Sequence, residues 1–364
     1  MKKVLSILMV LALISSLAVA CAKKTPAPQN DTKTEDTTDN SATAAPTEAA
    51  KTEPTTAPAA KPVEINVAYM PNFASLNTVV TGIKMGYFEE QGIKVNLVEF
   101  ADGPTIIAAM ESGSIDIGYI GPGAHKLCIE GRATIFATSH FGNADEVIGS
   151  ASKGITKIED LKGKKIAMAS GTSSETILDL TLKKAGLTKA DVTILDMDAS
   201  AIVTAMISGS VDACATWSPN TFAIKDAMGN DAVALSNNVM FIDESPSIAS
   251  WIVNPNYATD NAELILRYTK ALYKAMDYRA DEANLDQVVQ WVAEQVALDV
   301  ESVSNQRGDG DWMTAKELVE MISSGELEKA YKVQQDNFLA AGNITKEAPV
   351  GNYVMFANML EAAK

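Results

Sequence analysis

The hydrophobic and polar positions of the chain follow a strand-helix-strand pattern that occurs twice. In the first copy, VEINVAYM (residues 63–70) and IKVNLVEF (93–100) alternate as strands do, and an apolar helical face lies between them over Ala74–Met85. Asp102 can cap a second helix, and IDIGYI (115–120) follows as a third strand. Strands and helices that alternate in this order predict a parallel sheet covered by helices.

The same order restarts about midway along the chain. KKIAMAS (164–170) is typical of a strand, and Thr172 and Glu175 have the spacing of a capping box at the start of the next helix. DVTILDM (191–197) and VDACATW (211–217) continue as strands, with a helix between them. Two similar units predict two lobes.

Three other segments complete this plan. Arg132–Ser152 lies between the two units and is expected to cross from one lobe to the other. Ser247–Ala258 follows the second unit and is expected to cross back. From Asn261 onward the apolar spacing is helical, so we expect helices up to the end of the chain.

One phrase occurs in both units. AAMESGSIDIGYIGPG (108–123) and TAMISGSVDACATWSPN (204–220) share Ser-Gly-Ser-x-Asp. Asp116 and Asp212 fall at strand starts, away from the sheet edge where ligands bind, so we expect them to fix the turn between helix and strand. The unshared ends fall at the opposite edge and are candidate ligand contacts: Gly121, Pro122 and Trp217.

The loop over residues 170–174 is a candidate site for a small anionic group. It joins a strand to a helix N-terminus, where free N–H groups, hydroxyls and the positive end of the helix dipole converge. The alternative is a capping box without a ligand. Arginines are few and none lies in a predicted strand-end loop, so neutral dipoles would hold most of a bound anion.

The first 62 residues have the composition of a leader and a tether. Two lysines precede an apolar run, Val4–Ile14, and small residues then lead to Cys21, as in a bacterial lipoprotein signal. The tether, residues 21–62, is rich in Thr, Ala, Pro and charged residues and cannot bury enough apolar surface to fold. We expect a signal peptide over 1–20 and a lipid on Cys21; the alternative is an ordinary signal peptide with an incidental cysteine.

Composition excludes several functions. The net charge of −16 argues against nucleic acid or an anionic membrane face as a partner. The only histidines are His125 and His140, and the motifs HExxH, CxxC and GxSxG are missing, so we expect no catalytic residues, no metal and no cofactor. Cys128 and Cys214 could form one disulfide, although two buried thiols are the simpler interpretation.

Four stretches together resemble the solute-binding proteins of ABC importers for nitrate, taurine, aliphatic sulfonates and thiamine-pyrimidine precursors: GYFEEQGIKVNLVEF (86–100), GPTIIAAMESGSIDIGYIGPG (103–123), LKGKKIAMASGTSSET (161–176) and ISGSVDACATWSPN (207–220). The likeness covers about residues 63–255. It implies an α/β, two-lobed periplasmic-binding-protein fold of type II, with the ligand clamped between the lobes by hinge closure. Lobe 1 would take residues 63–145, lobe 2 residues 146–247, and residues 248–364 would return to lobe 1 and add the C-terminal helices.

The resemblance also implies which residues line the cleft. By position they are Asn72, Phe73, Gly121, Pro122, His140, Gly171, Thr172, Ser173, Ser174 and Trp217. Phe73 and Trp217 could pack on an organic group of the ligand or could belong to the core, and His140 could equally be structural.

The implied function is capture and delivery of a solute, without enzyme activity. Such a protein would be exported, lipid-anchored to the outer face of the bacterial cell membrane and monomeric, and would pass its solute to a membrane permease and its ATPase. A small sulfonate-type solute, an aliphatic sulfonate or taurine, is the first expectation. A thiamine-precursor pyrimidine, a nitrate-like anion and a secreted enzyme on the same two-lobed fold remain alternatives.

Overall fold

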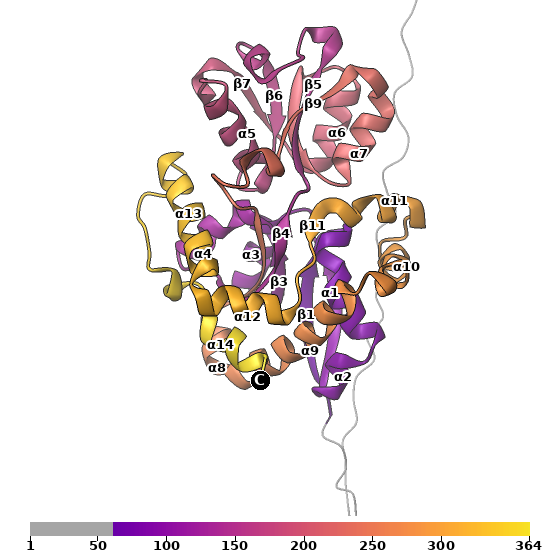
Figure 1. Cartoon of the computed structure of the whole chain (residues 1–364), viewed down its shortest axis with the longest axis vertical. Coiled ribbons are helices and arrows are strands. Elements are labelled where there is room, and N and C mark those ends of the chain that lie inside the picture. Colours follow the sequence, from indigo (N-terminus) through magenta and orange to yellow (C-terminus); the bar gives the residue numbers. More distant parts are fainter. Residues whose placement is uncertain (1–60) are drawn as a thin grey trace, which may run out of the picture. The chain divides into compact units, whose positions relative to one another are not determined.

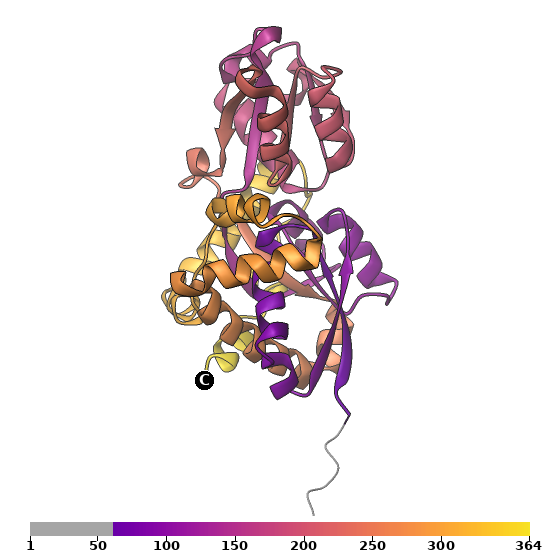
Figure 2. The ribbon, with the colours of Figure 1, turned by 90° about the vertical axis from the view of Figure 1, so that its right-hand side faces the viewer.

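The computed structural model describes residues 61–364. The expected signal peptide, Cys21 and all of the tether up to residue 60 lie outside the described residues and stay predictions. Within the described part the chain forms two lobes, each with its own sheet and helices (Figures 1 and 2).

The sheet of lobe 1 has six strands in the order β11-β4-β10-β3-β1-β2. Strand β1 pairs in parallel with β2 and β3, whereas β10 and β11 pair antiparallel to their neighbours, so the sheet is mixed. The bounds are β1 (Val63–Tyr69), β2 (Ile93–Glu99), β3 (Ile117–Ile120), β4 (Thr134–Gly142), β10 (Ile248–Val253) and β11 (Gly310–Asp311).

Lobe 2 has a five-stranded sheet in the order β7-β6-β8-β5-β9. Its parallel pairs join β6 to β7 and to β8, and β5 runs antiparallel to both of its neighbours. The bounds are β5 (Asp145–Ser150), β6 (Lys165–Met168), β7 (Thr193–Asp196), β8 (Ala213–Trp217) and β9 (Ala232–Asn237).

Helices cover both sheets. In the first unit they are α1 (Phe73–Lys84), α2 (Tyr87–Glu90), α3 (Gly103–Glu111) and α4 (His125–Ile129); in lobe 2 they are α5 (Ser173–Lys184), α6 (Ala199–Ile207) and α7 (Asn220–Met228). The C-terminal helices are α8 (Pro255–Asp260), α9 (Ala262–Ala280), α10 (Leu285–Val296), α11 (Val300–Ser304), α12 (Ala315–Ser324), α13 (Glu326–Ala340) and α14 (Phe356–Ala362). Short 3-10 turns include η1 (Pro122–Ala124), η6 (Asn238–Phe241) and η8 (Asn305–Asp309).

The C-terminal helices belong to lobe 1. Tyr268 of α9, Val292 of α10 and Tyr331 of α13 are buried in the same apolar cluster as the strands β1, β3 and β10. In lobe 2 the sheet separates two smaller clusters, one on the α5 side and one on the α6 side. Each lobe therefore has its own core, as a hinged pair of bodies requires.

The chain passes between the lobes twice, and the second passage differs from the prediction. Most of Arg132–Ser152 forms β4 and β5, and the two sheets are separated there by Asn143 and Ala144 alone. The prediction that Ser247–Ala258 crosses back to lobe 1 is wrong for most of this segment, because most of it already lies within lobe 1. All six residues of β10 are buried inside the lobe 1 sheet, so the crossing precedes that strand and runs over residues 238–247.

The repeated Ser-Gly-Ser-x-Asp phrase joins neighbouring strands. The Asp116 carboxylate accepts the N–H of Asn66 in β1 at 2.8 Å, and the Asp212 carboxylate accepts the N–H of Lys165 in β6 at 2.9 Å. Gly113 and Gly209 take the same left-handed conformation, with φ of 78° and 72°. The shared phrase is therefore structural in both lobes, and it bonds an adjacent strand as well as shaping the turn.

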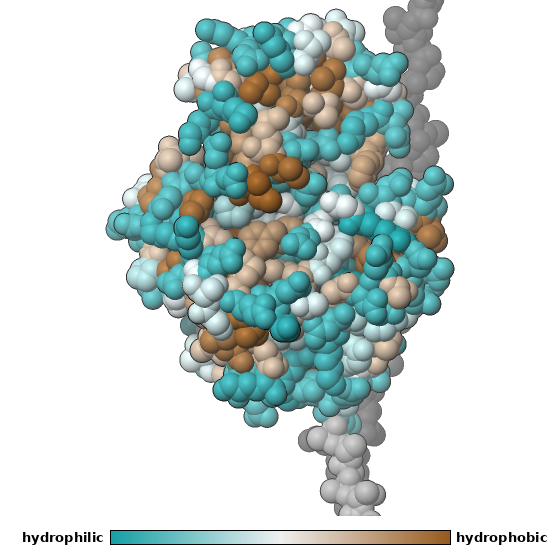
Figure 3. All heavy atoms as spheres, viewed as in Figure 1, coloured by the Kyte–Doolittle hydropathy of each residue, from teal (hydrophilic) through white to brown (hydrophobic). Residues whose placement is uncertain are grey.

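The surface of the described chain is mostly polar. The face in Figure 3 is mostly hydrophilic, with hydrophobic residues in small groups, one of them at the height where the lobes meet.

Cys128 and Cys214 are both free and buried, so the possible disulfide between them is not formed. Within residues 61–364 no helix combines the length and apolarity needed to cross a bilayer.

Candidate functional site: the cleft between the lobes

A cavity of about 60 Å³ lies where the two lobes meet. It opens beyond the carboxyl ends of β1, β3 and β8, the edge at which α/β sheets bind ligands. Its lining comes from both lobes: Met70, Asn72, Ala74, Asp102, Gly103, Tyr119, Gly121, Pro122, Ala124, His140, Gly142, Ala144, Asp145, Thr172, Ser173, Trp217, Ser218, Ser247, Ala249 and Asp309. The two lobes therefore enclose a small cavity between them.

The structure brings seven of the ten expected cleft residues to this cavity. They are Asn72, Gly121, Pro122, His140, Thr172, Ser173 and Trp217. The other three point elsewhere for reasons of packing. Phe73 is fully buried against the edge of Trp312, with ring centroids 5.4 Å apart. Phe73 therefore does not face a solute across from Trp217.

Ser174 and Gly171 support the helix start from behind. The Ser174 hydroxyl donates to the carbonyl oxygen of Ala215 at 2.7 Å and accepts the N–H of Ala169 at 3.1 Å, which joins α5 to β8. Gly171 adopts a φ of 79°, and its N–H, not that of Thr172, donates to the Glu175 carboxylate at 2.9 Å, so the expected capping box is not formed. Both residues shape the loop that presents Thr172 and Ser173 to the cavity.

Three helices begin at the cavity and direct the positive ends of their dipoles toward it. Asn72 caps α1 by accepting the N–H of Ser75, Asp102 caps α3 through Thr105, and the Thr172 hydroxyl accepts the N–H of Ser174 in α5. One first-turn residue of each helix lines the cavity: Ala74, Gly103 and Ser173. First-turn N–H groups lack partners within their own helix, so together these ends suit an acidic group of a ligand.

Two buried carboxylates in the cleft were missed by the sequence analysis. Asp145 accepts hydrogen bonds from the Ser173 hydroxyl and, at 3.0 Å, from the Asn238 side chain, and burial raises its pKa to about 6. Burial, together with the neighbouring charges of Asp145 and Glu146, raises the pKa of Asp309 to about 7. Asp145 lies in the segment that was expected to cross between the lobes, but it was not identified as a cleft residue. No sequence pattern marks Asp309 as a cleft residue, because only the two-residue strand β11, which follows it, brings it to the cleft.

His140 and Tyr119 form an aromatic wall. Their rings are stacked with centroids 6.1 Å apart, and His140 also contacts Trp312 at 4.8 Å. Burial and the charge of Arg279 lower the pKa of His140 to about 3, so its imidazole stays neutral. Arg279 lies behind this wall, bonded to the Asn77 side chain at 3.0 Å and to the carbonyl oxygen of Met313 at 3.1 Å.

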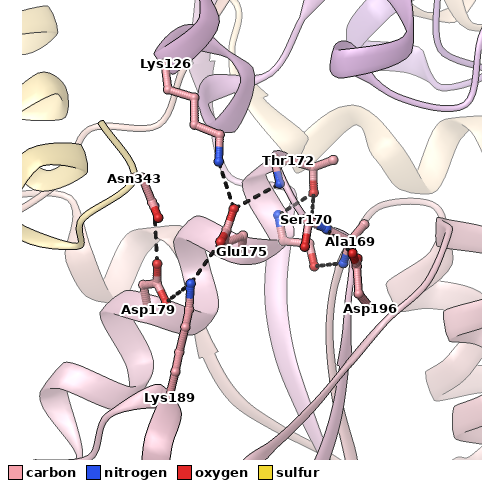
Figure 4. Close-up of polar contacts among 11 residues, drawn as sticks. Lys126, Ala169, Ser170, Thr172, Glu175, Asp179, Lys189, Asp196 and Asn343 are labelled. Carbon is pink, nitrogen blue, oxygen red and sulfur yellow. Dashed lines mark hydrogen bonds and ion pairs between the residues drawn. The ribbon is translucent and has the colours of Figure 1, made fainter. Parts of the chain in front are cut away.

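A polar network links the lobes beside the cavity (Figure 4). Lys126 of α4 donates to the Glu175 carboxylate of α5 at 2.9 Å, and Asn343, after α13, donates to Asp179 of α5 at 3.4 Å. We call these four residues the interlobe latch. Lys189, which belongs to lobe 2, bonds both carboxylates at 2.8 and 3.0 Å. Burial opposes the charge of Glu175, but Lys189, the Gly171 N–H and Lys126 outweigh it and lower its pKa to about 2.

The latch gives a prediction for solute affinity. Replacing Lys126 with methionine removes an ion pair that exists only when the lobes are together, so the affinity for a solute should fall about fivefold, or ~1 kcal/mol. Isothermal titration calorimetry measures this. Lys189→Met is the matched control, because it unpairs the same carboxylate from a partner in its own lobe. Equal losses in the two variants would show that the latch does not act on closure.

Comparison with known proteins places the chain in a family. Residues 73–283 match the family described as NMT1/THI5 like. A "Putative binding protein" of Brucella abortus (strain 2308) is 30% identical over 293 residues, which cover 80% of this chain and 90% of that protein. The taurine-binding periplasmic protein of Escherichia coli (strain K12) is 25% identical over 220 residues, or 59% of this chain and 66% of that protein.

Solved structures share the fold. The alkanesulfonate-binding protein SsuA from Xanthomonas axonopodis pv. citri, bound to MOPS, superposes with a TM-score of 0.65 at 22% identity and covers 81% of this chain and 99% of that chain. The desulfurization enzyme DszB also matches, with a TM-score of 0.57 at 14% identity, over 83% of this chain and 99% of that chain. The periplasmic-binding-protein fold is therefore confirmed, and by sequence the chain belongs to the NMT1/THI5-like family.

Proposed function

We propose that this protein is the extracytoplasmic solute-binding component of an ABC importer, which captures one small solute in the interlobe cleft and delivers it to a membrane permease and its ATPase. The observation that carries the proposal is the cavity itself, because residues of both lobes line it and helix starts from both lobes surround it. A solute that contacts both lobes favours the closed form over the open form. The relatives that are named as binding proteins support the same role.

For the solute, we propose a small sulfonate-type compound, with taurine ahead of plain aliphatic sulfonates. The helix starts of α1, α3 and α5 suit a sulfonate group. Asp145 and Asp309, however, place negative charge in the same cavity, which favours a zwitterion over a simple anion. The taurine-binding relative agrees with this choice. A thiamine-precursor pyrimidine is the alternative; it would rest on Tyr119 and Trp217, since Phe73 is buried.

The cellular setting is part of the proposal. Export and a lipid on Cys21 are suggested by the sequence of residues 1–21 alone. A single chain contains both lobes and the whole cleft, so a monomer suffices for binding.

A thermal-shift screen tests the role. Residues 61–364, screened with taurine, alkanesulfonates, nitrate and a hydroxymethylpyrimidine, should melt at a higher temperature with one of these solutes. A ligand that binds only the native state stabilises it by about 2.7 kcal/mol when its concentration is 100 times the Kd. The solute should be recovered unchanged afterwards. Conversion of the solute to a product would support the enzyme alternative, and an unchanged melting temperature with every compound would contradict the proposal.

A further inference from the structure

Two buried carboxylates reach the cleft from different lobes. Asp145 begins β5 in the sheet of lobe 2, and Asp309 ends η8, directly before β11 in the sheet of lobe 1. The carbonyl oxygen of Asp309 accepts the N–H of Asn143 at 2.6 Å, so its backbone is fixed beside the first crossing. Both side chains line the cavity and are close enough for the charge of Asp145 to act on Asp309.

No cationic side chain of the described residues lines this cavity. The nearby cations are already bonded elsewhere: Lys225 to the Glu146 carboxylate at 2.8 Å, and Arg279 to Asn77 and Met313 behind the aromatic wall. His140 lines the cavity but is neutral. The two carboxylates therefore face the cleft without a counter-ion from residues 61–364.

A second observation concerns two buried polar side chains that line the cavity, Ser218 and His140. The Ser218 hydroxyl lies close enough to lower the pKa of Asp309, yet within the described chain it makes no hydrogen bond of normal geometry. Ser218 is 2% exposed and lines the cavity. His140 is also 2% exposed, and among the hydrogen bonds of residues 61–364 only its Nδ1 takes part, with Ser139. Buried polar groups usually have partners, so these groups are available to a bound solute.

We propose that Asp145 and Asp309 form a subsite for a protonated nitrogen of the solute, an ammonium or amidinium group, and that this subsite selects amine-bearing solutes over amine-free anions. The inference rests on the proposed carrier function and specifies the class of solute. A cation between the carboxylates removes their mutual repulsion and donates charge-assisted hydrogen bonds to both sides of the cleft. Because each lobe supplies one carboxylate, the cation also links the lobes in the closed form.

The proposal implies that binding depends on pH. In the empty cleft, the raised pKa values of Asp145 and Asp309 keep the pair partly protonated near neutrality. A bound cation favours the ionised carboxylates, so the protons leave and affinity rises from pH 5 to pH 8. The other groups that act on the pair are Glu146 and Lys225, which are bonded to each other, and the neutral Tyr119 and His140 of the wall.

A matched pair of probes tests the subsite. Taurine and ethanesulfonate share a sulfonate and differ in the amine, and 4-aminopyrimidine and pyrimidine form a second pair. Calorimetry on residues 61–364 should give at least about a hundredfold tighter binding for the amine-bearing member of one pair. In Asp309→Asn this ratio should fall below about tenfold, and in the exposed control Asp311→Asn it should be unchanged. Titration of taurine in two buffers of different ionisation enthalpy should show proton release at pH 6.5, because its amine is already protonated in solution.

Each outcome decides the question. A ratio near one, tighter binding of ethanesulfonate, no binding of either amine-bearing probe, or an unchanged ratio in Asp309→Asn would overturn the subsite. Ethanesulfonate that binds at least as tightly as taurine and is returned unchanged would overturn the subsite while the carrier function stands. Turnover of any probe would instead count against the carrier function. If Asp309→Asn does not fold, the proton release of the unmodified protein decides alone. Its absence when an amine that is protonated in solution binds overturns the proposal.

Discussion

Replacing Gly123 with alanine is expected to lower the affinity of the cleft for its solute by roughly 10- to 100-fold. Gly123 lies in η1 of lobe 1, and its backbone packs against the start of α5 in lobe 2. A Cβ atom there would lie 2.0 Å from the carbonyl carbon of Thr172 and 2.4 Å from the nitrogen of Ser173. These are backbone atoms that no rotamer change can move, so the lobes would have to separate.

The open form should tolerate the same substitution, so the variant should fold and melt near the temperature of the natural protein without solute. Gly351→Ala is the matched control, because Gly351 does not line the cavity and its added Cβ would meet no atom within 4 Å. Calorimetry and solute-free melting curves on both variants separate closure from folding. Full affinity in Gly123→Ala would show that binding does not need this close approach of the lobes.

Asp309→Asn is expected to stabilise the solute-free protein at pH 8 and to change it little at pH 4. The pKa of Asp309 is raised from 3.8 to about 7, chiefly by burial and then by Asp145 and Glu146. A carboxyl with a raised pKa stabilises the fold fully below its unfolded value, and that contribution is lost as the pH rises through its folded value. Above pH 7 the ionised side chain therefore costs up to about 4 kcal/mol, which a neutral amide avoids.

Thermal melting across pH 4 to pH 8 measures this effect. The melting temperature of Asp309→Asn should exceed that of the natural protein by several degrees at pH 8, and the difference should shrink as the pH falls. Asp311→Asn provides the control, since its side chain is exposed two residues further along. A gain that is equal at both pH values would mean that the charge of Asp309 is not the cause. The gain in stability and the expected loss of amine selectivity in the same variant illustrate how a binding site is maintained at the expense of stability.

The local parts of the fold could be predicted from the sequence. Alternating strands and helix caps depend on residues a few positions apart, so the strand ends and the caps Asp102 and Thr172 were recognisable. The pairing of strands that are far apart in the sequence could not be predicted in this way. The central position of β10, and the two-residue pairing that brings Asp309 to the cleft, depend on segments more than a hundred residues apart.

The candidate site divides in the same way. Residues directly after strands, such as Asn72, Gly121 and Thr172, could be placed at the cleft, because the ends of neighbouring parallel strands meet at one edge. The sequence could not, however, predict which side chains of the first helical turn point into the cleft. Phe73 follows Asn72 directly, yet it packs on Trp312, which lies in the C-terminal part of the chain. The orientation of Ser174 likewise depends on its bond to Ala215 of β8.

The central claim is that the cleft binds one small solute and returns it unchanged. The most direct measurement is equilibrium dialysis of residues 61–364 with the solute that the thermal-shift screen identifies, followed by mass spectrometry of what the denatured protein releases. We predict saturation at one solute per chain, with all of it recovered intact. A release of product, or binding that does not saturate at one equivalent, would contradict the claim.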